Sequence, residues 1–110
     1  MAVLGKKAAI INGDGVGPEL VDAMTHVLKA CNTQIELIRC EAGSEQWEKH
    51  GGDTYIPDKT AKIMEESDAC FKGPTTTIPD PKAPRSVAVS TRQKFELYAN
   101  VRPIKTYDRL

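Results

Sequence analysis

Two arginines and a serine in the C-terminal part of the sequence have the chemistry to bind a carboxylate-rich anion. Ser86 and Arg92 lie six residues apart on one predicted helix, about 9 Å and about 120° from each other, so both can approach one ligand. Arg102 follows Val101 in a predicted strand, so we expect it to be partly buried and to need an anionic partner. A guanidinium group matches both oxygens of a carboxylate. These residues predict a site for a di- or tricarboxylate, and the alternative is that they are ordinary surface side chains.

A second candidate site is a lysine followed by three consecutive threonines, Lys72 with Thr75, Thr76 and Thr77. This segment comes directly after a predicted strand, and α/β proteins bind ligands at the carboxyl ends of their strands. An ammonium group beside hydroxyl groups can bind an amide or a phosphate. The alternative is a solvated loop, because threonines are common in such loops.

A glycine-dense turn, Gly13-x-Gly15-x-Gly17, connects a predicted strand to a predicted helix. The dinucleotide fingerprint requires Gly-x-Gly-x-x-Gly, and here the third glycine comes one residue early. Two interpretations stay open at this turn. The glycines either permit a tight turn with positive φ, or they form a ligand-binding backbone at the carboxyl end of a strand.

Alternating strand and helix patterns predict an α/β fold with a layered and largely parallel sheet. Pro18 suits the first turn of a helix, and Asp58 and Ser86 are predicted to cap the two later helices. The predicted strands cover 8–11, 35–40, 69–71 and 98–102; the predicted helices cover 19–30, 45–50, 58–66 and 86–97, and a proline-rich loop covers 75–84.

Composition narrows the classes of partner and compartment. Fifteen basic residues balance fifteen acidic ones, which disfavours binding to nucleic acid or to a membrane surface through bulk charge. The three cysteines include no Cys-x-x-Cys pair, as is typical of reduced thiols in a cytosol-like compartment. We therefore expect a cytoplasmic protein, or one of the mitochondrial matrix if a targeting segment has been removed. The residues contain neither a complete catalytic set nor metal-ligand spacing.

Three sequence blocks together resemble the isocitrate and isopropylmalate dehydrogenases, a family of metal-dependent β-decarboxylating enzymes. The blocks are Asn-Gly-Asp-Gly-Val-Gly-Pro-Glu-Leu (12–20), Phe-Lys-Gly-Pro-Thr-Thr-Thr (71–77) and the segment 85–105, which contains Tyr-Ala-Asn-Val-Arg-Pro. The resemblance implies the layered α/β fold of that family, which is a dimer and not the dinucleotide-binding Rossmann fold. Because family members are several times longer, residues 1–110 are expected to be the N-terminal segment of the large α/β domain, with an incomplete sheet.

The resemblance also implies residue roles and a reaction. Ser86, Arg92 and Arg102 match the residues that hold the substrate carboxylates, while Lys72 and the threonines at 75–77 match the loop beside the nicotinamide ring and the substrate. The implied reaction is oxidative decarboxylation of isocitrate, a tricarboxylate, to 2-oxoglutarate with NAD or NADP and with Mg²⁺ or Mn²⁺. The catalytic residues and the metal ligands are expected beyond Leu110, so this chain alone should be inactive.

Two departures from the family pattern keep other functions open. Ala88 stands where isocitrate enzymes usually carry a substrate-contacting asparagine, and the proline-rich segment 78–84 replaces a glycine-rich stretch. The alternatives are isopropylmalate or homoisocitrate as substrate, or a non-catalytic regulatory or interaction subunit of the same fold. A homodimer or a related oligomer is the expected assembly.

Overall fold

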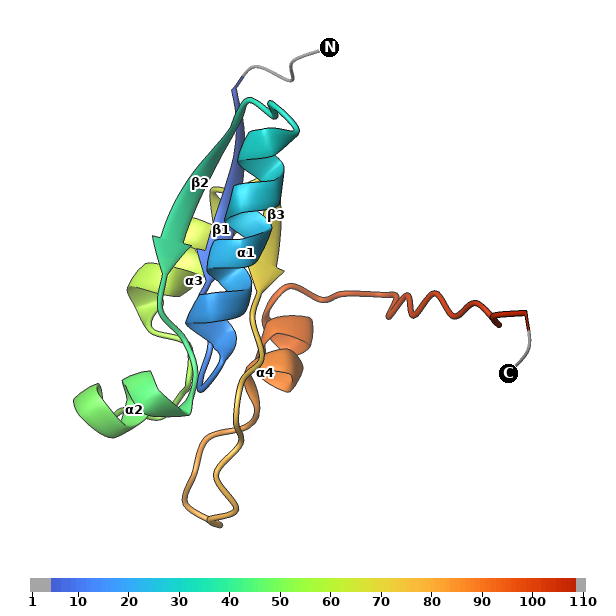
Figure 1. Cartoon of the computed structure of the whole chain (residues 1–110). Coiled ribbons are helices and arrows are strands. Elements are labelled where there is room, and N and C mark those ends of the chain that lie inside the picture. The colour runs from blue at the N-terminus through green and yellow to red at the C-terminus, as the bar shows by residue number, and fades with distance from the viewer. Residues whose placement is uncertain (1–4, 109–110) are drawn as a thin grey trace.

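Residues 5–108 are described by a computed structural model, which has three parallel strands and four helices (Figure 1). The element order is β1 (Lys6–Ile11), α1 (Gly17–Ala30), β2 (Ile35–Cys40), α2 (Ser44–His50), α3 (Asp58–Glu65), β3 (Ala69–Lys72) and α4 (Val87–Lys94). The predicted α/β class and the parallel sheet are confirmed. Within the described range, every helix is too short or too polar to cross a bilayer.

The central strand is β1, which pairs with β2 on one side and with β3 on the other. Its residues Ala9, Ile10 and Ile11 are fully buried, as expected for a short apolar run at the middle of a parallel sheet. All four residues of β3 are exposed at the edge of the sheet. The sheet of the described residues therefore ends at β3 with an unpaired edge.

The main hydrophobic core lies on the face of the sheet that α3 covers. Ala9 and Ile11 point to this face because side chains alternate along a strand, and they pack with Ala61 and Met64 of α3. Val87, the first residue of α4, belongs to the same cluster. Helix α1 crosses in front of the sheet in Figure 1.

The helix boundaries confirm some predicted caps and correct others. Pro18 lies in the first turn of α1, and the Ser86 hydroxyl accepts the backbone N–H of Val89 at 3.3 Å, as predicted. Asp58 is not a cap. It is the first residue of α3, Pro57 occupies the capping position, and no side chain caps this end. Helix α4 ends at Lys94 rather than at residue 97.

The predicted strand 98–102 is absent. Residues 97–107, all within the described part, form neither helix nor strand, and this segment extends away from the other elements in Figure 1. Val101 keeps 83% of its surface exposed, and Arg102 is exposed as well, so its expected burial is also wrong. Apolar and polar residues do alternate here, but a strand needs a neighbouring strand to form hydrogen bonds with its backbone N–H and C=O groups. No described strand lies beside this segment.

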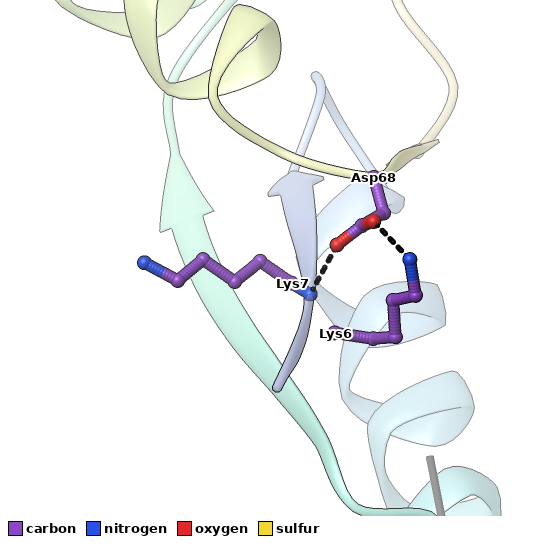
Figure 2. Close-up of polar contacts among 3 residues, drawn as sticks. All are labelled: Lys6, Lys7 and Asp68. Atoms are coloured by element: carbon purple, nitrogen blue, oxygen red, sulfur yellow. Dashed lines mark hydrogen bonds and ion pairs between the residues drawn. The ribbon is translucent and has the colours of Figure 1, made fainter. Parts of the chain in front are cut away.

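The starts of β1 and β3 are joined through Asp68 (Figure 2). Its carboxylate accepts hydrogen bonds from the Nζ group of Lys6 at 2.6 Å and from the backbone N–H of Lys7 at 3.0 Å. In return, the carbonyl of Lys7 accepts the backbone N–H of Asp68 at 3.0 Å. The hydrogen bond from Lys6, followed by the one from Lys7, lowers the pKa of Asp68 below its ordinary value of 3.8. This contact fixes the register in which β3 joins β1.

Candidate functional site

The glycine turn after β1 packs closely against the loop after β3. A Cβ at Gly13, whose φ is +79°, would lie 2.1 Å from the carbonyl oxygen of Pro74. A Cβ at Gly17 or at Gly73 would lie 2.1 or 2.3 Å from the carbonyl oxygen of Asn12. The chain's own backbone fills the space beside these three glycines. Gly13 and Gly15 have positive φ, as the tight-turn interpretation expects, and the missing side chains at Gly13, Gly17 and Gly73 let the two loops approach each other.

Asp14, in the middle of this turn, is the buried polar centre of the region. The residue is 5% exposed, and its carboxylate accepts hydrogen bonds from three backbone N–H groups, those of Ser44 at 3.1 Å, Glu45 at 2.9 Å and Thr76 at 2.7 Å. Sequence reasoning missed this role. The available signal was an aspartate flanked by glycines at the carboxyl end of an apolar strand, where a carboxylate can approach neighbouring backbone donors.

The Lys72–Thr77 segment begins at the last residue of β3 and passes the glycine turn. The Nζ group of Lys72 donates to the carbonyl of Gly73 at 3.0 Å and to the hydroxyl of Thr75 at 3.4 Å. Thr75 is half-buried, whereas Thr76 and Thr77 are exposed. The segment therefore lies at the carboxyl end of the sheet, as predicted, with two threonines open to a ligand.

A pocket of about 470 Å³ lies between β3, the end of α3 and α4, and it has a largely apolar lining. Lys72 and Arg92 both line it, and so does Ala88. Ser86 and Arg102 are not among its lining residues, since Ser86 caps α4 and Arg102 lies in the exposed segment after that helix. The structure thus brings together Lys72 and Arg92 from the two predicted sites and does not bring the three substrate-site residues together.

A smaller pocket of about 250 Å³ lies between the glycine turn and α2, and its lining is more polar. Asn12 and Gln46 contribute to it, and the side-chain oxygens of both are buried without a hydrogen-bond partner among the described residues. Glu41, Glu45 and Lys49 complete much of its wall.

The described residues offer no group of three or more His, Cys, Asp or Glu side chains that could hold a metal ion.

The three cysteines are free, and burial, together with the neighbouring Cys70, raises the pKa of the Cys40 thiol to about 11.

Comparison with known proteins decides the family. A family model described as isocitrate/isopropylmalate dehydrogenase matches residues 7–110. This chain belongs to the isocitrate/isopropylmalate dehydrogenase family. Its α/β sheet is accordingly a part of that family's fold, and the resemblance of the three sequence blocks is confirmed.

Members of the family that are similar to this chain carry different substrate names. An isocitrate/homoisocitrate dehydrogenase of Pyrococcus horikoshii and a 3-isopropylmalate dehydrogenase of Saccharolobus solfataricus are each 34% identical to it, over 92% and 91% of the chain. The crystal structure of an isocitrate dehydrogenase from Methylococcus capsulatus shares 40% identity and a TM-score of 0.76 over 84% of the chain. The chain spans 29% of the length of both relatives and 26% of that structure's chain. The family of dehydrogenases is settled, whereas the relatives divide between substrates.

Proposed function

We propose that this chain contributes a substrate-binding and a cofactor-binding part to an NAD(P)-dependent dehydrogenase that oxidatively decarboxylates isocitrate. The single observation that carries the proposal is the pocket shared by Lys72 and Arg92. Lys72 and Arg92 line this pocket together with Asp68, whose carboxylate is already paired with Lys6, so the two cations would complement an anion such as isocitrate, which carries three carboxylates. Their role would be to position the acid and to complement its charge.

The largely apolar lining of the pocket supports this role. Ile11, Met64 and Phe95 line it beside the two cations, so a bound anion would be shielded from water on several sides. Ion pairs are stronger where the surroundings are less polarisable than water. Arg92 can bind two carboxylate oxygens at once, whereas Lys72 acts as a point charge.

The loop after β3 is the part of this chain that suits the nicotinamide cofactor. Its exposed Thr76 and Thr77 hydroxyls and the half-buried Thr75 can donate to and accept from an amide or a ribose. The cofactor, when bound, takes the hydride from the substrate. Since no described cluster suits Mg²⁺ or Mn²⁺, no step of the reaction is assigned to a metal held by these residues.

Two observations favour isocitrate over isopropylmalate and homoisocitrate. The Lys72–Thr77 block resembles the corresponding block of the isocitrate enzymes, and the isocitrate dehydrogenase structure from Methylococcus capsulatus is 40% identical to this chain. Isopropylmalate also has an apolar branch in place of one carboxylate. This branch would not pair with the second cation of the pocket. The family relationship itself is equally compatible with all three acids.

The decisive experiment measures NADH or NADPH production by the intact gene product with each of the three acids, in the presence of Mg²⁺. We expect isocitrate to give the highest kcat/KM. A higher kcat/KM with isopropylmalate or homoisocitrate would replace isocitrate as the substrate. Omission of the acid, and separately of the cofactor, provides the controls.

A non-catalytic subunit is the second candidate, and Ala88 is the observation that favours it. Ala88 lines the pocket with a methyl group where isocitrate enzymes usually carry an asparagine, so a hydrogen bond to the substrate would be missing. A subunit of this kind would bind isocitrate, detected by calorimetry, without producing NADH or NADPH from any of the acids. Both readouts together separate the two candidates.

A further inference from the structure

We propose that Asp14 is a positioning residue that holds the Lys72–Thr77 loop in place, together with the side chain of Tyr55. The proposal rests on the function proposed above, because it assigns the support of the loop that would contact cofactor and substrate. Asp14 would not touch either molecule. It would act through the backbone of Thr76.

The carboxylate of Asp14 connects two segments that are far apart in the sequence. One oxygen, Oδ2, accepts the N–H of Thr76 at 2.7 Å and that of Ser44 at 3.1 Å, while Oδ1 accepts the N–H of Glu45 at 2.9 Å. Both oxygens of the Asp14 carboxylate accept hydrogen bonds, whereas an amide of the same shape would turn an N–H₂ group toward one set of donors. Hydrogen bonds to a charged acceptor are also the stronger ones.

Tyr55 holds the same loop at a second point. It is fully buried; its hydroxyl accepts the backbone N–H of Ile78 at 3.2 Å, and its carbonyl accepts the N–H of Gly43 at 3.0 Å. The loop is therefore fixed at residues 76 and 78, and both supports are connected to the start of α2.

The packing around Asp14 leaves the carboxylate little freedom to move. A Cβ at Gly43 would lie 2.6 Å from each carboxylate oxygen, so only glycine permits this approach. The backbone N–H of Asp14 itself donates to the carbonyl of Pro74 at 2.8 Å. Side chain and main chain of Asp14 thus both bind the loop, two residues apart. These contacts hold the backbone of the loop at Pro74 and Thr76, and the Thr76 and Thr77 side chains extend from this backbone.

The first test compares hydrogen exchange in the intact gene product and in its Asp14→Asn variant. We expect the backbone amides of segments 43–46 and 74–79 to exchange about tenfold faster in the variant, as a lost charge-assisted hydrogen bond implies. Tyr55→Phe, which keeps the ring, should accelerate only the segment around Ile78. The matched control is Asp80→Asn, since Asp80 accepts the N–H of Lys82 at 2.8 Å in the same exposed loop. Unchanged exchange in Asp14→Asn would overturn the proposal.

The second test separates positioning from mere stability by steady-state kinetics on the same variants. A misplaced loop should raise KM for the acid or for the cofactor about tenfold in Asp14→Asn and leave the shape of the pH profile unchanged, because Asp14 transfers no proton. A purely structural residue would lower the active fraction, and hence kcat, at constant KM, and that result would refute the positioning role. If the unmodified protein oxidises none of the acids while exchange still responds to Asp14→Asn, the proposed function fails and the support of the loop stands.

Discussion

Lys72 and Arg92 line one pocket from two different elements, Lys72 from the last residue of β3 and Arg92 from the last turn of α4. The long loop 73–86 connects β3 to α4, so the path of this loop determines where α4, and with it Arg92, lies relative to Lys72. A polyanion bound in this pocket would pair with both cations. This pairing is the basis of the first prediction.

Arg92→Gln should weaken binding of the acid to the intact gene product. The loss of one charge-assisted hydrogen bond is expected to raise KM for isocitrate about 10- to 150-fold, equivalent to about 1.5–3 kcal/mol. Arg85→Gln is the matched control, because Arg85 is exposed and donates to Gln93 at 3.0 Å outside the pocket. Equal effects of the two substitutions in steady-state assays would remove Arg92 from the site.

Gly13→Ala should destabilise the fold considerably more than Gly15→Ala. Both glycines have positive φ, +79° and +57°, which costs an alanine about 1–2 kcal/mol. Only the Cβ at position 13 also meets backbone, the carbonyl oxygen of Pro74, and this overlap should add about 1–3 kcal/mol. Urea unfolding followed by circular dichroism measures the difference. Equal midpoints would show that the turn and the Pro74 loop separate easily.

Asp68 should contribute to stability at neutral pH and lose this contribution in acid. Its pKa is lowered in the folded protein by Lys6 and by the N–H of Lys7, so the folded state binds the proton less readily than the unfolded chain. The contribution is therefore complete above the ordinary carboxyl pKa and disappears as the pH falls through the lower, folded value. Asp68→Asn should lower the urea midpoint at pH 7 and have no such effect in strong acid. A difference that persists unchanged in acid would contradict this assignment.

Cys40 should make the protein sensitive to alkali. Its folded pKa is about 11 and the ordinary value is 9.0, so at intermediate pH the unfolded chain loses a proton that the folded protein keeps. The stabilising contribution is complete below pH 9.0 and is lost as the pH rises toward 11. Cys40→Ala should flatten the decline in unfolding free energy over this range, measured by urea titration at several pH values. Cys31→Ala, at an exposed cysteine, should retain the full decline.

The sequence was sufficient for the elements that carry their own pattern. The apolar run before the glycine turn, the helical spacing after Pro18 and the Ser86 cap are local features, and the structure has all of them. The prediction of a strand at 98–102 was wrong. Alternating apolar residues indicate that a segment can form a strand, but the strand also needs a neighbouring strand to pair with, and the described residues do not provide one. Asp58 failed as a cap because the helix begins one residue earlier than predicted, so that Asp58 is its first residue and Pro57 holds the capping position.

The site was predictable only in part, because its key contacts join distant positions. Placement of Lys72 at the carboxyl end of a strand followed from the strand pattern. The role of Asp14 did not, since its donors lie about 30 and 62 positions away in the sequence and nothing local marks them. The predicted convergence of Ser86 and Arg102 relied on helix geometry and on a strand that is not formed. Distances along one helix can be calculated from sequence, while approaches between loops cannot.

The parallel arrangement of the strands has a consequence for the order of folding. Lys6 lies opposite Ile35, while Ala8 lies opposite Ala69, so β1 can contact β2 much earlier in synthesis than β3. A parallel pair cannot form through a tight turn, and each pairing must first close a long loop. We therefore expect the β1–α1–β2 unit to form before β3 joins the sheet. The hydrogen bond between Lys7 and Asp68, which are 61 positions apart, would form last, when β3 pairs with β1. We expect the rate of this pairing to limit how quickly the three-stranded sheet assembles.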